Sequence, residues 1–99
     1  MQTLRTAEEA TVFAAEVVRR HLPSGGYRVF LFGSRADGSA HERSDIDIGI
    51  EGPRPVPSDA LAAIQDELDE APTLYTIDVV DFARVSQVFR QVAWQRVPL

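Results

Sequence analysis

Isoleucine alternates with polar or small residues along residues 44–50, and this alternation constrains the fold more than any other stretch of the sequence. The apolar positions are Ile46, Ile48 and Ile50, and the positions between them are Asp45, Asp47 and Gly49. Side chains two residues apart on a strand project from the same face. The pattern therefore predicts a strand with one apolar face and two aspartates side by side on the other.

Two more strands and three helices are predicted around this strand. Residues 27–32 are aromatic or β-branched on both faces, as in a central strand covered on each side, and residues 74–80 give a third strand. Three helices are indicated by apolar residues at helical spacing. The first begins after a capping box at Thr6, and the other two after predicted caps at Ser58 and Ser86. The order α, β, β, α, β, α predicts an α/β (α+β) fold, a small mixed β-sheet flanked by helices.

Each predicted helix has an apolar side that we expect to face the core. The inward residues are Ala10, Phe13, Ala14, Val17 and Val18 in the first helix, Leu61, Ile64 and Leu68 in the second, and Val85, Val88, Phe89 and Val92 in the last. Trp94, Val97 and Leu99 form an apolar tail. The tail either completes the core or contacts another chain, and the sequence does not decide between these.

Length and composition exclude several classes of protein. With 99 residues, the chain is expected to form a single domain, residues 1–99. The absence of Cys excludes disulfides, thiol nucleophiles and Cys-ligated zinc. A net charge of −5 argues against direct nucleic-acid binding and against an anionic membrane surface. No apolar run approaches a membrane span, and residues 1–5 lack the apolar stretch of a signal peptide, so a cytoplasmic location is expected.

Three aspartates are the candidate metal ligands. Asp45 and Asp47 share one strand face, where ionised carboxylates repel unless a cation, a proton or full solvation relieves them. Asp78 joins them if the third strand lies beside the second. Three converging carboxylates make an all-oxygen site that suits Mg²⁺ or Mn²⁺. The simpler interpretation of Asp45 and Asp47 is the solvent-facing edge of a half-buried strand.

A Gly-Ser pair directly follows the first predicted strand. Gly33 permits a close backbone approach, and free N–H groups together with the Ser34 hydroxyl can hold a phosphate. Standing alone, the pair is more simply an ordinary strand-ending turn. Its position, ten residues before Asp45, makes it part of a larger pattern.

This pattern, Gly33-Ser34, ten residues, then Asp45-Ile46-Asp47, resembles the signature of the nucleotidyltransferase superfamily related to DNA polymerase β. The wider match looks like the minimal nucleotidyltransferases, small prokaryotic proteins often encoded beside a HEPN-domain partner. It is carried by residues 32–36, Gly38 and residues 44–48, while residues 76–81 resemble that family's third-carboxylate strand. The resemblance extends from Thr6 to the C-terminus and implies the nucleotidyltransferase fold.

The resemblance also implies a function. An acceptor hydroxyl on a partner protein attacks the α-phosphate of a nucleoside triphosphate, ATP by family analogy, and AMP is transferred as pyrophosphate leaves. Such proteins act as antitoxins to a HEPN-domain toxin encoded nearby, so a hetero-oligomer is expected. By resemblance, two Mg²⁺ ions, or Mn²⁺, are held by Asp45, Asp47 and Asp78, with Asp78 alternatively taking the acceptor's proton. Nucleotide contacts fall to Gly33, Ser34, Arg35 and Ser44.

One position departs from the family pattern. Relatives commonly carry Arg where this chain has Asp37, whose charge weakens nucleotide binding unless it faces solvent or pairs with Arg35 or Arg43. This leaves two alternatives to catalysis. The chain is then either a catalytically degenerate antitoxin that neutralises its partner by complex formation, or a nucleotide-sensing module that binds ATP without transferring it. Asp81 follows the third predicted strand, where an Asp ahead of a helix is more often a cap than a ligand, and it is left out of the site.

Overall fold

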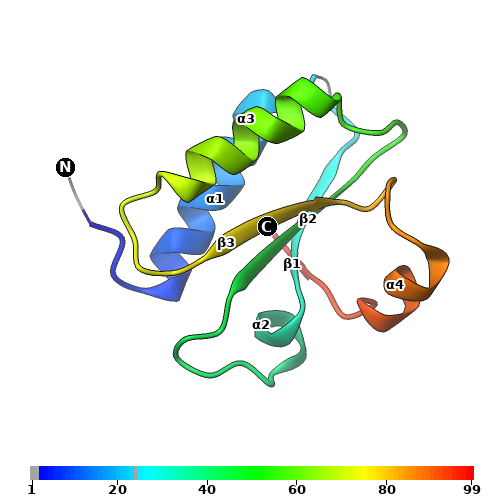
Figure 1. Cartoon of the computed structure of the whole chain (residues 1–99). Coiled ribbons are helices and arrows are strands. Elements are labelled where there is room, and N and C mark those ends of the chain that lie inside the picture. Colours follow the sequence, from blue (N-terminus) through cyan, green and yellow to red (C-terminus); the bar gives the residue numbers. More distant parts are fainter. Residues whose placement is uncertain (1–2, 24) are drawn as a thin grey trace.

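The computed structural model describes residues 3–23 and 25–99; Met1, Gln2 and Ser24 lie outside it, so the signal-peptide assessment of residues 1–5 is only partly covered. The elements are α1 (Ala7–His21), β1 (Arg28–Phe32), α2 (Ser34–Asp37), β2 (Ile46–Glu51), α3 (Ser58–Asp69), β3 (Ile77–Asp81), α4 (Gln87–Val92) and β4 (Val97–Pro98). Figure 1 shows them around one sheet, of order β3-β2-β1-β4. β1 runs antiparallel to β2 and β4, and β2 runs parallel to β3, so the sheet is mixed, as predicted.

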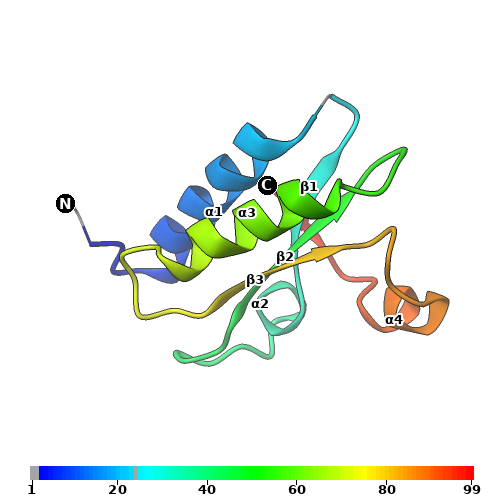
Figure 2. The same ribbon diagram turned by 45° about the horizontal axis from the view of Figure 1, so that its top comes forward.

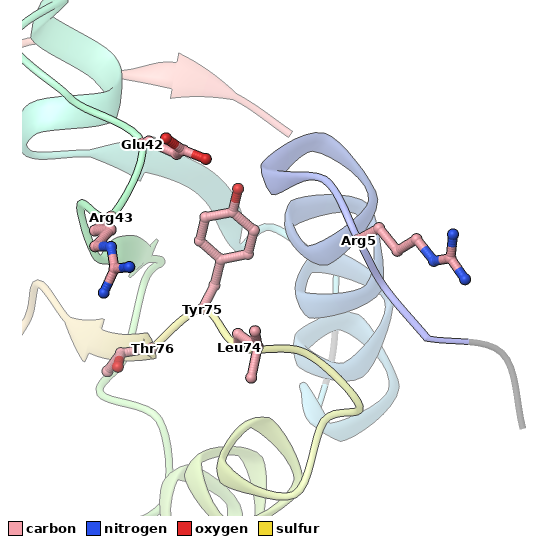
Figure 3. Close-up of a pocket in the computed structure, with 6 residues that line it drawn as sticks. All are labelled: Arg5, Glu42, Arg43, Leu74, Tyr75 and Thr76. Atoms are coloured by element: carbon pink, nitrogen blue, oxygen red, sulfur yellow. The ribbon is translucent and has the colours of Figure 1, made fainter.

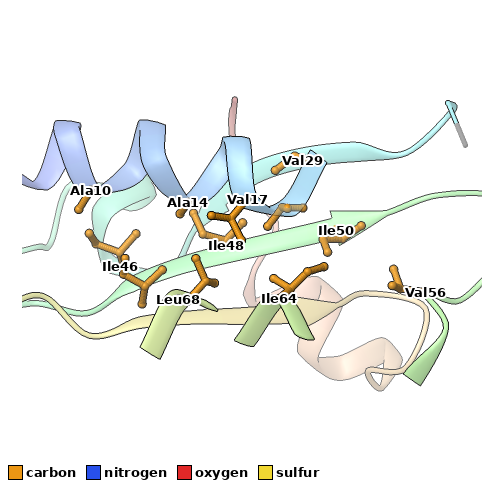
Figure 4. Close-up of a cluster of buried hydrophobic side chains, with 12 residues drawn as sticks. Ala10, Ala14, Val17, Val29, Ile46, Ile48, Ile50, Val56, Ile64 and Leu68 are labelled. Atoms are coloured by element: carbon orange, nitrogen blue, oxygen red, sulfur yellow. The ribbon is translucent and has the colours of Figure 1, made fainter. Parts of the chain in front are cut away.

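Helices α1 and α3 lie side by side over one face of the sheet (Figures 1 and 2). The isoleucines of β2 point into this layer, where they pack against the apolar sides of both helices (Figure 4). Ala10, Ala14, Val17 and Val18 of α1 are fully buried there, as the periodicity predicts. The capping box at Thr6 is confirmed, since its side chain accepts from the Glu9 N–H and the Glu9 carboxylate accepts from the Thr6 N–H.

The opposite face of the sheet carries a cluster of aromatic rings. Phe30 and Phe32 of β1 contact Phe82, with ring centroids 4.9 and 5.1 Å apart in edge-to-face arrangements. Gly49 makes room for this cluster, because a Cβ at that position would lie 2.2 Å from the Phe30 ring. Strand β1 is therefore covered on both faces, which confirms the prediction for residues 27–32, although the strand starts at Arg28.

Strand β3 lies at the edge of the sheet, and a glutamine of α3 occupies part of its free side. The Gln65 amide nitrogen donates to the Ile77 carbonyl at 2.9 Å, and its oxygen accepts from the Val79 N–H at 3.0 Å. The side chain thereby satisfies backbone groups that an unpaired edge leaves open. This bond pair fixes α3 along β3, the strand that carries Asp78.

Several element boundaries differ from the prediction. β2 starts at Ile46 instead of residue 44, and β3 starts at Ile77 instead of residue 74. The short elements α2 and β4 were not predicted, because neither four helical residues nor two strand residues produce a periodic pattern. The Ser58 cap is wrong: Pro57 takes the cap position and no side chain bonds the helix end. The Ser86 cap is confirmed, because its hydroxyl accepts from the Phe89 N–H.

The last helix is less buried than its periodicity suggested. Val85 and Phe89 lie against the aromatic cluster, whereas Val88 and Val92 are 69% and 79% exposed. The expectation that all four face the core is therefore wrong, because α4 covers the sheet with only one narrow side. None of the helices in the described part of the chain is both long enough and apolar enough to span a lipid bilayer.

Candidate active site

Two of the predicted carboxylates lie next to each other at the end of the sheet where β1 finishes and β2 begins. Asp47 is the register partner of Phe32 on one side and of Asp78 on the other. Register partners on neighbouring strands present their side chains on the same face. Because the isoleucines of β2 face α1 and α3, Asp47 and Asp78 belong to the opposite face, the one that carries the aromatic cluster.

The third carboxylate is placed differently. Since β2 begins at Ile46, Asp45 belongs to the preceding loop and is exposed. Over residues 3–23 and 25–99, no three acidic or histidine side chains are gathered closely enough to hold a metal ion as they stand. The structure thus brings Asp47 and Asp78 together on adjacent strands, and leaves Asp45 beside them at the end of a loop instead of on the strand face.

The carboxylates at this edge of the sheet repel one another. Burial raises the pKa of Asp47 above its usual value, and the neighbouring charges of Asp78 and then Asp45 raise it further. A divalent cation relieves such repulsion, and carboxylate oxygens are the donors that Mg²⁺ and Mn²⁺ prefer. The chemistry of these donors therefore fits a hard divalent cation, which Asp47 and Asp78 would hold from adjacent strands and Asp45 would reach only by a movement of its loop.

Gly33 brings the backbone directly against the Asp47 carboxylate. Its φ of +73° is a conformation that other residues rarely adopt, and a Cβ there would lie 2.5 Å from Asp47 Oδ2. A side chain at this position would therefore strain the backbone and displace the Asp47 carboxylate. The chain then turns into α2, in which the Gly33 carbonyl accepts from the N–H groups of Ala36 and Asp37. The Gly-Ser pair consequently stands at the same end of the sheet as Asp47.

The Arg35 side chain binds the loop that leads to Asp45. Its Nη2 donates to the Ser44 carbonyl at 2.8 Å, and its Nε to the same oxygen at 3.1 Å. Longer bonds from Nη2 reach the carbonyls of His41 and Glu42. The guanidinium also lies over the Tyr75 ring, 5.1 Å from its centroid. Arg35 thus connects α2, the loop before β2 and the segment before β3.

Two other predicted residues of this region are engaged within the loop. The Ser44 hydroxyl accepts from the His41 N–H at 2.9 Å, which closes a turn. Asp37 is exposed and accepts from the N–H and hydroxyl of Ser39, and these bonds lower the pKa of its carboxyl. Asp37 therefore faces solvent and forms no salt bridge with an arginine in the described structure. Solvent exposure is one of the two arrangements in which its negative charge is not expected to weaken nucleotide binding.

A cavity of about 470 Å³ adjoins the same loop (Figure 3). Its lining residues are Arg5, Glu42, Arg43, Leu74, Tyr75 and Thr76. Figure 3 shows the Tyr75 side chain pointing toward Glu42, while Arg5 points away from the cavity. None of the three aspartates lines it, so this hollow is not the site that the motif predicts.

Asp81, at the far end of β3, has a different role from Asp78. It is 3% exposed, and its carboxylate accepts from the Val56 N–H at 2.8 Å and the Ala83 N–H at 3.0 Å. Arg84 pairs with it at 3.2 Å. Asp81 therefore caps the turn after β3 and ties it to the segment before α3. Asp81 does not cap α4, because Ser86 caps that helix.

Comparison with known proteins identifies the family. The family model described as polymerase beta, nucleotidyltransferase, matches residues 27–96, which include Gly33 and all three aspartates. The chain belongs to this nucleotidyltransferase family. It is also 32% identical over 66 residues to a Haemophilus influenzae protein named probable protein adenylyltransferase MntA. That match covers 67% of this chain and 58% of the relative, so the chain spans less than two thirds of that protein's length.

Solved structures of family members share the fold. A mutant toxin–antitoxin complex containing MntA matches with a TM-score of 0.68 at 28% identity, over 90% of this chain and 70% of that one. A toxin–antitoxin structure with AMP-PNP matches with a TM-score of 0.64 at 25% identity, over 93% of this chain and 71% of that one. The nucleotidyltransferase fold implied by the sequence is therefore confirmed.

Proposed function

We propose that this nucleotidyltransferase-family chain transfers AMP from ATP to a hydroxyl of a partner protein in a metal-dependent reaction. The partner that fits is a HEPN-domain toxin encoded nearby, which the chain neutralises as its antitoxin in the cytoplasm. The observation that carries the proposal is the in-register pair Asp47 and Asp78, with the Gly33 backbone against the Asp47 carboxylate. The adenylyltransferase name of one relative and the nucleotide analogue in one similar structure support the same chemistry.

Each site residue has a role in this proposal. Asp47 and Asp78, with Asp45 from the loop, would hold Mg²⁺ or Mn²⁺, which when bound stabilises the attacking and leaving oxygens. Gly33 and Ser34 offer a backbone N–H and a hydroxyl to the β- and γ-phosphates. The acceptor hydroxyl forms a bond to the α-phosphorus as the bond to pyrophosphate breaks. The proton of that hydroxyl passes to the Asp78 carboxylate.

Arg35 acts in this scheme by positioning the loop that carries Asp45. Arg35→Ala removes the bonds to the loop carbonyls, so we expect transfer to fall about tenfold and the apparent affinity for Mg²⁺ to weaken. Arg35→Lys should not restore activity, because an ammonium group cannot reproduce the planar fork. Transfer rates measured across a Mg²⁺ titration check both statements.

The matched control for Arg35 is Arg43→Ala, a change of the same residue type in the loop itself. Arg43 makes no described side-chain hydrogen bond or ion pair within residues 3–23 and 25–99. We expect its removal to change transfer by less than about twofold. An Arg35→Ala variant with unchanged Mg²⁺ dependence would show that the loop does not need this anchor.

The proposed transfer is tested by the intact mass of the HEPN-domain product of the neighbouring gene. The partner is incubated with this protein, Mg²⁺ and each nucleoside triphosphate in turn, beside an Asp78→Asn control. We expect a mass gain of one or more AMP units with ATP and none in the control. A stable complex without any mass gain would contradict the enzymatic proposal and favour neutralisation by binding, the main alternative that the sequence leaves open.

A further inference from the structure

The segment after β3, residues 82–99, is here named the C-terminal arm, and it concentrates the exposed apolar surface of the molecule. Within the described residues, large exposed hydrophobic side chains occur at seven positions, and five of these are in the arm. They are Val88, Phe89, Val92, Trp94 and Val97. Val88 and Val92 lie four residues apart in α4 and so occupy the same side of that helix. Neighbouring exposed apolar side chains of this kind are characteristic of contact sites for other proteins, whereas single exposed hydrophobic residues are ordinary.

The arm is also opposite in charge to the rest of the chain. It contains three arginines and no acidic residue, while the remaining residues carry a net charge of −8. Arg84 is paired with Asp81, and Arg96 is paired with Glu51, whose pKa is lowered mainly by that hydrogen bond. Arg90 donates to the Phe82 carbonyl and forms no direct salt bridge in the described structure, although its charge also helps to lower the pKa of Glu51. The arm therefore places an arginine without a direct carboxylate contact beside apolar side chains.

A hollow of about 550 Å³ on the arm combines these two properties. It is lined by Gln87, Arg90, Gln91 and Trp94. The Trp94 side chain is 70% exposed and supplies an aromatic wall, while Arg90 supplies a cation. Tryptophan and arginine are the residue types most enriched among the energetically dominant contacts of protein interfaces. The hollow thus suits a carboxylate-bearing or apolar side chain from another protein.

The arm lies beside the candidate active site. Phe89 of α4 contacts Phe32, with ring centroids 5.9 Å apart. Phe32 is the register partner of Asp47 and directly precedes Gly33. The α4 part of the arm and the carboxylate pair consequently share one face of the sheet, the face that α1 and α3 leave free (Figure 1). Val97, the register partner of Leu31, and Leu99 belong to the other face and are not part of this surface. A protein bound on the arm has its surface next to Asp47 and Asp78.

We propose that the C-terminal arm is the docking surface for the partner protein that carries the acceptor hydroxyl. The partner contacts the arm through an apolar patch bordered by carboxylates, which pair with Arg90. Docking there delivers the acceptor to the carboxylate pair. The inference rests on the proposed function for the identity of the partner, and on the arm's own surface for the location.

The test introduces charge into the exposed side of α4. Val88→Asp with Val92→Asp places carboxylates where the partner is expected to present its own, and Val88→Lys with Val92→Lys is the matched change of opposite sign. Val12→Asp, at a 60% exposed valine on α1, is the control on the other face. Affinity for the neighbouring HEPN-domain protein is measured by calorimetry, together with binding of ATP and Mg²⁺ and with circular dichroism as a check of folding.

We expect the Asp pair to weaken partner binding at least about 30-fold, the Lys pair to weaken it less, and Val12→Asp to change it by less than about twofold. Binding of ATP with Mg²⁺ should stay at the wild-type level in all three. An Asp pair that binds the partner normally would overturn the proposal. The proposal would also be overturned if sedimentation showed that the arm joins two copies of this chain and the variants bound the partner with unchanged affinity.

The same samples separate this inference from the proposed function. A complex that depends on the arm but yields no AMP transfer supports the docking surface and contradicts the transfer reaction. AMP transfer that persists at the wild-type rate in the Asp pair, at partner concentrations below saturation, supports the reaction and contradicts the docking surface. A wild-type chain that neither binds nor modifies the partner contradicts both.

Discussion

Asp47→Asn is expected to abolish AMP transfer and, in the same molecule, to stabilise the fold. Transfer should fall by at least about 10³-fold, because even one lost contact to developing charge costs about 10²–10³-fold in other enzymes. Stability should rise, because the Asp47 carboxylate is partly buried and is repelled by Asp78 and Asp45. Because solvent screens the repulsion of a carboxylate that is only partly buried, we expect a gain of at most about 1 kcal/mol without divalent cations, or roughly 4–8 °C in Tm at that limit.

The stability gain should depend on pH with a defined sign. The pKa of Asp47 is raised in the folded state, so the folded protein binds a proton more readily than the unfolded chain does. The wild type therefore loses stability as the pH rises from the ordinary aspartate value through the raised pKa. The advantage of Asp47→Asn is complete above this window and vanishes below it. Thermal unfolding in EDTA between pH 3 and pH 8 measures the effect.

Divalent cation and a second variant provide the controls for Asp47. Added Mg²⁺ should stabilise the wild type and have little effect on Asp47→Asn, since the cation then has lost a fixed ligand. Asp45→Asn should give a smaller stability gain, because that side chain is exposed. An Asp47→Asn variant that is less stable than the wild type in EDTA would show that this carboxylate supports the fold instead of opposing it.

Asp81→Ala should have the largest effect on stability, about 3 kcal/mol of destabilisation. The change removes the acceptor for the buried N–H of Val56 and for the N–H of Ala83, an exposed residue, and a buried donor left without a partner costs about 1–3 kcal/mol. It also removes the ion pair with Arg84. Urea unfolding at neutral pH measures the loss.

Asp78→Ala is the matched control for Asp81, because the same change is made on the same strand. Asp78 is half-buried and faces Asp47, so its removal is expected to leave stability unchanged or to raise it slightly. The two variants should also separate by activity, since Asp81→Ala retains transfer per folded molecule and Asp78→Ala does not. Equal destabilisation by both would contradict the division of β3 into a structural end and a candidate catalytic end.

The period-two pattern of residues 44–50 was sufficient to predict a strand and the direction of its faces. It could not predict where β3 starts relative to β2, and the Asp47–Asp78 register depends on that offset. The offset is set by contacts distant in sequence, among them the bonds from Gln65 to β3. The same pattern placed Asp45 on the strand, whereas the loop that Arg35 holds delays the start of β2 to Ile46.

Other features lay outside what periodicity or motif can predict. The family resemblance predicts a nucleotide contact for Arg35, which stays a prediction; the bonds of its guanidinium to loop carbonyls were not predicted, because no sequence pattern encodes bonds to backbone oxygens. Asp81 was expected to cap a helix because a helix follows it, and its burial became visible only with the packing of Val56 against the β3 end. The exposure of Val88 and Val92 likewise depends on how α4 meets the sheet.

Nucleotidyl transfer at the Asp47–Asp78 edge is tested by following the α-phosphate and the γ-phosphate of ATP separately. The wild-type chain and its HEPN-domain partner are incubated with Mg²⁺ and with ATP labelled at either the α- or the γ-phosphate. We expect the partner to acquire the α-label while the γ-label leaves in pyrophosphate, and we expect no label on the partner when Asp47→Asn replaces the wild type. Incorporation of the γ-label, or α-label incorporation that survives Asp47→Asn, would contradict nucleotidyl transfer at this edge.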